Sequence, residues 1–505
     1  MATMELKMFK DTVTTAGQLC DTRLELPIET EVLIPDYLPE VFKIVKSFVY
    51  PVVLQKQVQA GRLTVEGYFR VEIFYQGEEK SLCSMEQKVP FSRQVELKNA
   101  DSGVTEVSVS GEVQYINCRA VNQRRLDIRG AYNLSVRATA ALPQEILTAV
   151  SGMGVQQKLM PLDTVGILLS PEKQFTLEEE ISFEGQPLGV LHTQNVVHVQ
   201  EVKLVSGRAV VKGEVAATVT YRNEEGLQHA EQTLEFNQII ELEGVTEDCE
   251  CQVALTPIGC TISAGEENGG YQISVTCILA VKAMKQLQYL AVCDGFSTQY
   301  EVACTRKEIG TELLLDHLTN TVETEAQGKL PDAAAKVLDC YATCFTPELT
   351  QAEGENSVSI HGRAIAHLIC VNALEEIECY DKVCEYTLPK KYNVPLQEID
   401  ASLTAQCVNI RAVKNGEEAA AELDIMVKGV LLQKKKVSVV EELSCGEELE
   451  KENDVALRVY YADAGEAVFD IAKRYHASPA DVAALAGIET DTLDEAQRLL
   501  IPMTE

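Results

Sequence analysis

The sequence predicts a mainly β protein, with three tandem domains of β-sandwich or barrel type followed by a small α+β domain of βααβ order. Three observations lead to this prediction. Gly67, Gly213 and Gly362 recur at intervals of about 150 residues, and each opens a run with strand-like alternation. Turn-forming segments separate further runs rich in β-branched residues. Helical periodicity is clear only near the C-terminus.

The three glycines mark a repeat of domain size. A second set of positions stands eight residues after them, and an aromatic set follows 23 or 24 residues after them. These sets are Tyr75, Tyr221 and Cys370, and then Phe91, Phe236 and Tyr386. A unit of this length is too long for one coil of a solenoid, so each repeat should close its own core.

The run after Gly67 alternates with period two. Val71, Ile73 and Tyr75 point to one side, and Arg70 and Glu72 to the other. This pattern predicts a half-buried strand, and the glycine suits a bulge or a close backbone approach. We also expect one short helix near the start of each repeat, at Leu38–Val45, Pro187–Leu191 and Asp332–Leu338.

Three segments share no pattern with one another, and we interpret them as linkers: Ser151–Pro171, Phe296–Gly328 and Glu441–Asp454. They divide the chain into predicted domains at residues 30–145, 172–292, 325–442 and 457–503.

The first repeat carries a family resemblance. The phrase Ile-Pro-Asp-Tyr-Leu-Pro-Glu-Val at Ile34–Val41, the strands around Gly67 and the later strand around Gly130-Ala131-Tyr132 resemble the SPOCS domain of spore-coat proteins. Three copies would cover about residues 30 to 442. The second copy lacks the Pro-Asp start, so the resemblance there rests on the repeat itself.

The C-terminal segment predicts a helical pair. Val468, Ile471, Ala472 and Tyr475 follow helical spacing, and Ser478-Pro479 supplies an N-cap and a proline at N1 for a second helix. The segment from Tyr460 to Pro502 is similar to a LysM module, which implies a two-stranded sheet carrying two helices.

LysM modules hold chains of N-acetylglucosamine in a shallow groove. The resemblance places this groove, as a partner- or glycan-binding site, at Gly465, Glu466, Ala467, Val468, Phe469, Ala486, Gly487, Ile488 and Leu493. This chain departs from the family pattern at three places. Where the family usually has Gly-Asp-Thr-Leu, the chain has Gly-Glu-Ala-Val at Gly465–Val468. It has Ala486 in place of the usual Asn, and Glu495-Ala496 in place of the usual Pro-Gly. The lost hydroxyl and amide could have bonded a sugar, so binding of protein and binding of glycan both stay open.

Charge and hydropathy limit the partners and the location. With 77 acidic and 44 basic residues the net charge is -33, which repels nucleic acid. No apolar run is long enough for a transmembrane helix, and Met1–Lys10 has no apolar region typical of a secretory signal. We therefore expect the protein to stay in the cytosol where it is made.

No sequence motif indicates an enzyme, a cofactor or a metal site. Phosphate-loop, His-Glu-x-x-His and Gly-x-Ser-x-Gly motifs are absent, and the sixteen cysteines, which lack zinc-site spacing, are expected to be mostly buried thiols. His361 and His367 are the closest suggestive pair, with Cys370 beyond, but His367 falls on the polar side of a strand and should face solvent. The runs Glu178–Glu180 and Lys434–Lys436 should be solvated, the latter at a strand end.

Three functions follow from these resemblances. SPOCS repeats ending in LysM resemble SipL-type spore coat morphogenetic proteins, which implies a non-enzymatic scaffold at the forespore surface in the mother cell. Its LysM module would bind the SpoIVA-like coat ATPase, and other coat proteins would bind elsewhere. Alternatively, LysM recognises peptidoglycan or its lipid-linked precursor. A third hypothesis is a hydrolase that uses LysM for targeting.

Overall fold

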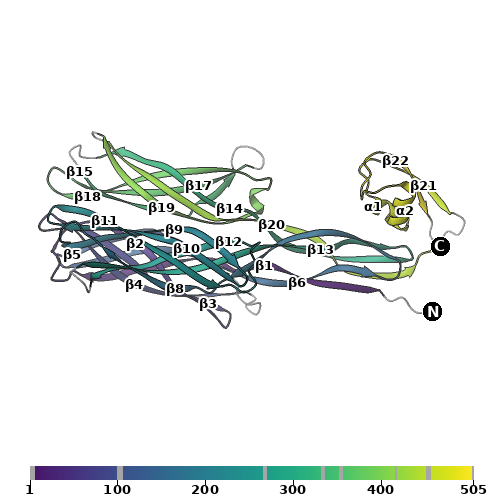
Figure 1. Ribbon diagram of the computed structural model, residues 1–505, viewed down its shortest axis with the longest axis horizontal. Coiled ribbons are helices and arrows are strands. Elements are labelled where there is room, and N and C mark those ends of the chain that lie inside the picture. The colour runs from purple at the N-terminus through teal and green to yellow at the C-terminus, as the bar shows by residue number, and fades with distance from the viewer. Residues whose placement is uncertain are drawn as a thin grey trace.

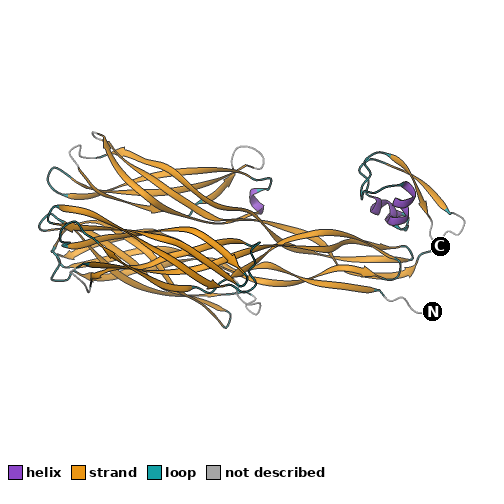
Figure 2. Ribbon diagram, viewed as in Figure 1, coloured by secondary structure: helices purple, strands orange, loops and turns teal. Residues whose placement is uncertain are grey.

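The computed structural model describes residues 6–98, 106–265, 270–330, 336–351, 357–415, 418–450 and 456–502. The chain is mainly β, with tandem β domains and a small helical pair at its C-terminal end (Figures 1 and 2). The predicted fold class is confirmed at this level. None of the helices in these ranges is long and apolar enough to cross a membrane.

The first repeat is a sandwich of two antiparallel three-stranded sheets, ordered β1-β6-β5 and β2-β3-β4. Its strands are β1 (Lys7–Leu33), β2 (Val41–Gln59), β3 (Arg62–Gly77), β4 (Leu82–Glu96), β5 (Glu106–Asn122) and β6 (Arg125–Ser151). Alternate residues of both sheets fill the core between them, among them Phe69, Leu126 and Ile128, which are almost fully buried.

The second and third repeats keep this strand order, with one strand position divided between two strands in each. The second comprises β7 (Val155–Leu169), β8 (Lys173–Ile181), β9 (Gly189–Val205), β10 (Arg208–Asn223), β11 (Gly226–Glu241), β12 (Glu250–Ala264) and β13 (Tyr271–Ser297). The third comprises β14 (Tyr300–Lys329), β15 (Lys336–Cys344), β16 (Glu348–Gln351), β17 (Ser357–Val371), β18 (Ile377–Lys391), the single turn η2 (Leu396–Glu398), β19 (Ile399–Asn415) and β20 (Glu418–Glu448). In the second repeat β7 and β8 together replace one long first strand, and both pair with β13.

The repeated glycines and aromatic residues are direct partners across neighbouring strands. Gly67 pairs with Phe91 in the first repeat, Gly213 with Phe236 in the second and Gly362 with Tyr386 in the third. Beside Gly67 the partner strand β2 is irregular, and a Cβ there would collide with the carbonyl oxygen of Val52. The close backbone approach predicted for this glycine is therefore present.

The first and last strands of each repeat extend beyond the sandwich as a two-stranded antiparallel ribbon. The ribbons β1/β6, β7/β13 and β14/β20 pack together into a stalk, while the three sandwiches form a head (Figure 1). One buried residue from each of the six strands forms a stalk cluster: Val13, Ile146, Leu162, Ala291, Ile309 and Val439. This apolar cluster holds the three ribbons together.

Two expectations about the repeat boundaries are wrong. The segments interpreted as linkers are mostly strand, because β7, β14 and the end of β20 run through them as stalk ribbons. The short helices expected at Leu38–Val45 and Pro187–Leu191 are also wrong, because β2 begins at Val41 and β9 at Gly189. Of the third, Asp332–Leu338, residues 336–338 belong to strand β15 and the rest lies outside the described residues. Proline near a pattern start marks a chain turn here, not a helix N-terminus.

The C-terminal module has the predicted βααβ order. It comprises β21 (Leu457–Ala462), α1 (Val468–Arg474), α2 (Pro479–Ala486) and β22 (Gln497–Pro502), with β21 antiparallel to β22. Residue 503, the end of the predicted domain range, lies outside the described residues. The module lies beside the end of the stalk farthest from the head (Figure 1).

Candidate binding module and the junction between the repeats

Local sequence determines the two helices of the module. Ser478 caps α2, because its Oγ accepts a hydrogen bond from the amide of Asp481 at 3.3 Å, and Pro479 occupies the first turn. Gly487 ends this helix in the left-handed conformation, with φ of 64°. Lys473 and Arg474 lie in the last turn of α1, where cations interact favourably with the helix dipole.

The module has its own apolar core. Val468, Ile471 and Ala472 of α1 and Val482 of α2 are buried against Leu499 and Ile501 of β22. This agrees with the helical spacing seen in the sequence. Ile471, Ala472, Val482, Leu499 and Ile501 show no measurable exposure, so the core is closed on the helix side of the sheet.

Two backbone segments that carry predicted groove residues, residues 465–468 and 491–493, are hydrogen-bonded to each other. The amide of Gly465 donates to the carbonyl of Leu493 at 2.7 Å, and the amide of Leu493 donates to the carbonyl of Glu466 at 3.0 Å. The amide of Val468 donates to Asp491 at 3.0 Å. The segment before α1 and the segment before β22 are therefore joined by backbone hydrogen bonds.

The nine predicted groove residues differ in exposure. Val468 and Leu493 are buried in the core, and Gly465 and Gly487 are exposed. The remaining five, Glu466, Ala467, Phe469, Ala486 and Ile488, are half-buried. A partner could therefore touch the glycines, the small side chains and Ile488, whereas Val468 and Leu493 would act by holding the surface in shape.

Glu466 holds the loop in place. Its carboxylate accepts hydrogen bonds from the Tyr460 hydroxyl at 2.9 Å and the Asp463 amide at 3.0 Å, and it pairs with Arg474 at 3.2 Å. These bonds, led by that from the Asp463 amide, lower the pKa of Glu466. The carboxylate is therefore ionised and already bonded within the module.

Phe469 faces the stalk. Its ring meets the ring of Phe296, at the end of β13, edge to face with centroids 5.2 Å apart. The Lys158 ammonium of β7 lies 5.6 Å from the centroid of the Phe469 ring. Sequence reasoning assigned Phe469 to the groove, but its contacts are those of a docking residue between module and stalk.

Polar contacts surround this aromatic pair. Lys473 of α1 forms an ion pair with Asp294 of β13 at 2.6 Å, and Arg306 of β14 approaches the same carboxylate at 3.2 Å. His476 Nδ1 lies 3.1 Å from the carbonyl oxygen of Ser297. The outer face of α1 is therefore the docking face of the module.

The head contains a second assembly of side chains, where the three repeats meet. Its apolar centre includes Phe48 and Phe74 of the first repeat, Leu191 of the second, and Tyr341 and Ile369 of the third. The rings of Phe48 and Phe74 meet edge to face at 5.7 Å, and Phe74 lies 5.5 Å from Tyr341. We call this set and its polar border the junction.

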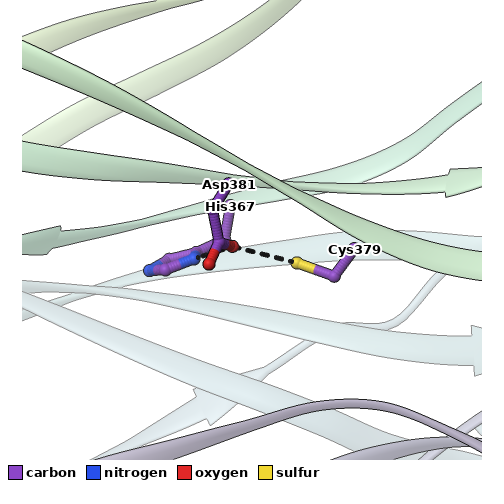
Figure 3. Close-up of side chains that lie close together, drawn as sticks. All are labelled: His367, Cys379 and Asp381. Carbon is purple, nitrogen blue, oxygen red and sulfur yellow. Dashed lines mark hydrogen bonds and ion pairs between the residues drawn. The ribbon is translucent and has the colours of Figure 1, made fainter. Parts of the chain in front are cut away.

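Figure 3 shows one polar border of the junction, at His367, Cys379 and Asp381. His367 Nδ1 lies 2.7 Å from Asp381 Oδ1, and the thiol of Cys379 lies 3.7 Å from the same oxygen. Lys46 of the first repeat forms an ion pair with the other oxygen of Asp381 at 2.5 Å. The carboxylate therefore joins the third repeat to the first.

The expectation that His367 faces solvent is wrong, because only 4% of the residue is exposed. It does lie on the polar side of β17, as predicted, but this side packs against the first repeat. Its ring meets that of Phe48 with centroids 4.9 Å apart. The alternation in the sequence identified the face correctly and could not show what covers it.

The potential ligand atoms of His367, Cys379 and Asp381 lie within 4.8 Å of one another. The arrangement nevertheless suits a structural lock better than a metal site or a nucleophile. Both ring nitrogens of His367 have partners, since Nε2 lies 2.9 Å from the Thr343 hydroxyl. Burial raises the pKa of the Cys379 thiol to about 12, so the reactive thiolate is rare near neutral pH.

Other polar pairs join the second repeat to its neighbours. His192 of β9 and Glu72 of β3 are both buried and lie 2.8 Å apart, and Arg70 lies 3.3 Å from the other carboxylate oxygen. The Thr220 hydroxyl of β10 donates to Asp339 of β15 at 3.3 Å. Each repeat is therefore bonded to both others around the apolar centre.

The predicted runs of like charge are exposed, as expected. Glu178–Glu180 lie exposed on β8, and Lys434–Lys436 lie exposed on β20. The lysines were expected at a strand end but lie in the middle of β20. Lys434 forms an ion pair with Asp400 at 2.5 Å. All sixteen cysteines are free, five of them buried and eleven half-buried.

Sequence reasoning missed the junction and the docking contacts. His367 corresponds to Glu72 in the repeat register, and a polar residue at the same strand position in two copies could have indicated a shared contact. Asp294 and Phe296 carried no such signal, since they fell at the edge of a predicted linker.

The fold and the junction define a protein of tandem β-sandwich repeats that are locked together and end in a small βααβ module. The family model described as SipL, SPOCS domain, matches residues 40–121 and 188–263, which contain β2 to β5 and most of β9 to β12. The first two repeats are therefore SipL-type SPOCS domains, which indicates a coat-related protein of sporulation. No curated protein and no solved structure matches the chain.

Proposed function

We propose that the chain is a non-enzymatic scaffold of the spore coat, which acts in the mother cell at the forespore surface. Its C-terminal module is a LysM module that binds the SpoIVA-like coat morphogenetic ATPase. The SPOCS repeats tether further coat proteins. Several modest contacts on one chain raise the effective concentration of each partner at an assembling surface.

One observation carries this proposal: the module docks through the outer face of α1 and keeps most of the groove residues out of that contact. Phe469, Asp470 and Lys473 contact the stalk. Gly465, Gly487 and Ile488 form none of these docking contacts. The stalk therefore presents the module with its groove side available to a partner.

The polar groups of this surface favour a protein partner over a glycan. The Glu466 carboxylate and the Gly465 amide already have partners within the module. Small apolar side chains and half-buried Ile488 remain, and these suit an apolar contact with a protein. The βααβ fold is equally that expected of a glycan-binding LysM, so peptidoglycan is the rival ligand.

The test uses the full chain and two baits, the purified SpoIVA-like ATPase and insoluble peptidoglycan. An Ile488→Asp variant places a charge in the groove, and Leu485→Asp is its matched control, because Leu485 is exposed on α2 outside the predicted groove. We expect the ATPase to bind wild type and L485D and to bind I488D at least about tenfold more weakly. Binding to peptidoglycan alone would replace this proposal with the glycan one, and binding to neither bait would remove both.

A further inference from the structure

The head has an end that faces away from the module. In the first repeat β1 runs from the stalk into the head, and in the second β7 and β8 do so in succession, so the turns that follow, residues 34–40 and 182–188, lie at the far end. The turns that connect β3 to β4, β10 to β11 and β17 to β18 lie at the same end by the antiparallel pairing of these strands. Figure 1 shows these turns at the left, opposite the C-terminal module. We call this end the distal tip.

The three repeats contact one another at the distal tip. The side chain of Gln76, fully buried, donates to the carbonyl of Glu375 at 2.6 Å and accepts from the amide of Ile377 at 3.1 Å. The Ser84 hydroxyl donates to the carbonyl of Leu191 at 2.7 Å, which links the first repeat to the second. The tips therefore form one connected surface.

Large apolar side chains are exposed at this end in all three repeats. Tyr37 is 84% exposed, Leu374 is 72% exposed and Leu188 is 56% exposed. Leu33 and Phe42 flank the Tyr37 turn and are exposed as well. Single exposed apolar residues are ordinary on protein surfaces, but their recurrence at one end of three packed repeats indicates an interaction surface.

The turn that carries Tyr37 is held rigid. The amide of Leu38 donates to the carbonyl of Pro35 at 3.0 Å, and Arg124 donates to the same carbonyl at 3.1 Å. Arg124 also donates to Glu40 at 2.9 Å. An aromatic side chain on a preformed turn loses little backbone freedom on binding, which favours an anchoring role.

The charge around these residues indicates the class of partner. The equivalent turn carries two consecutive glutamates in every repeat: Glu78-Glu79, Glu224-Glu225 and Glu375-Glu376. Lys80 pairs with Glu375 at 2.6 Å and Lys43 pairs with Glu376 at 3.5 Å, whereas Glu79, Glu224 and Glu225 are exposed beside the apolar side chains. An acidic border attracts a basic surface and repels a second acidic tip.

We propose that the distal tip is a docking surface for a basic coat protein, anchored by Tyr37, Leu188 and Leu374. The exposed apolar side chains of the tip insert between side chains of the partner. Lysines or arginines of the partner form ion pairs with the glutamates of the three turns. The chain then bridges two partners, one at the module and one at the opposite end of the head. This proposal rests on the coat role proposed above but not on the ligand of the module.

The test compares three forms of the full chain. The tip variant carries Tyr37→Ser, Leu188→Ser and Leu374→Ser. The control variant carries Ile239→Ser, Leu290→Ser and Val383→Ser, which replace residues that are also exposed but lie away from the tip. Circular dichroism melting is used first to establish that all three forms are folded. The probes are individually purified basic coat proteins from the spores of the same organism, with acidic coat proteins as the counter-set, and dissociation constants are measured by biolayer interferometry.

We expect at least one basic coat protein to bind wild type and the control variant alike, to bind the tip variant about tenfold or more weakly, and to weaken as salt is raised. Equal binding of the tip and control variants, no binding of any basic coat protein, or equal binding of the acidic set would overturn the proposal. The I488D variant separates the two surfaces, because it should keep full binding at the tip. Loss of ATPase binding in that variant with tip binding intact would show that the two surfaces act independently, whereas failure of the wild-type chain to bind the ATPase would remove only the function proposed for the module.

Discussion

Phe91 on β4 lies directly opposite Gly67 on β3, and its ring covers the glycine. A Cβ added to Gly67 would lie 3.0 Å from Cζ of Phe91. An aromatic ring that covers a glycine on the neighbouring strand replaces the packing that the missing side chain would supply. The same relationship joins Gly213 to Phe236 and Gly362 to Tyr386. It explains why the glycine and the aromatic residue recur together with fixed spacing in all three repeats.

This relationship predicts that Gly67→Ala destabilises the first repeat. The new Cβ would collide with the carbonyl oxygen of Val52 and crowd Phe91, and overpacking of this kind costs about 1–3 kcal/mol. Urea unfolding followed by circular dichroism measures the change. Gly310→Ala is the control, since no atom lies within 4 Å of a Cβ there, and it should shift the free energy of unfolding by less than about 0.5 kcal/mol. Equal effects of the two substitutions would contradict the assigned role of Gly67.

A second prediction concerns stability at acid pH. Burial alone would raise the pKa of Asp381 and of Asp400, but hydrogen bonds from His367 and Lys46, and from Arg137 and Lys434, hold both pKa values below the usual range. In each pair a cation of the first repeat meets a carboxylate of the third, Lys46 with Asp381 and Arg137 with Asp400.

A lowered pKa in the folded state stabilises the fold above the ordinary aspartate pKa of about 3.9 and loses this effect as pH falls through the folded value. We therefore expect the melting temperature to fall as pH drops from about 5 to 3. The double variant Asp381→Asn, Asp400→Asn should melt lower at pH 7 and show a flatter decline, while exposed Asp36→Asn should follow wild type. An unchanged slope in the double variant would refute this account of the junction.

The cysteines should be slow to react in the folded chain. Burial raises the pKa of Cys340, Cys344 and Cys407 to about 12, as it does for Cys379. At pH 8 only about one in ten thousand of such thiols is ionised. Alkylation by iodoacetamide, followed by mass spectrometry, should be at least about a hundredfold slower at these sites in the native chain than in urea. Comparable rates would show that these sites are open to solvent.

The docking of the module yields a fourth prediction. Phe469→Ala with Lys473→Ala removes the ring contact to Phe296 and the ion pair with Asp294, and both side chains lie at the contact with the stalk. We expect the module to stay folded but to move relative to the stalk, seen as a larger radius of gyration in small-angle scattering. Tyr461→Ala, an exposed residue of β21 without docking contacts in the described residues, is the control. No change in scattering would mean that other contacts hold the module.

The spacing of Gly67, Phe91 and Tyr75 was sufficient to predict repeated β domains, and helical spacing from Val468 to Tyr475 was sufficient for the helical pair. These are local patterns, in which the period of the side chains reports the element directly. The groove set was only partly informative, because Phe469 falls on the face of α1 that meets the stalk. Whether a half-apolar helix face meets its own core or another domain depends on partners distant in sequence.

The sequence by itself therefore determined the strands around the repeated glycines, the number of repeats and the βααβ order of the module. Only the tertiary structure decided that the supposed linkers pair as stalk ribbons, that His367 and Glu72 are buried between repeats, and that Phe469 docks on Phe296. The physical reason is that periodicity shows which side chains share a face, whereas the burial of a polar face depends on ion pairs and apolar contacts between residues more than 100 positions apart, such as Glu72 and His192.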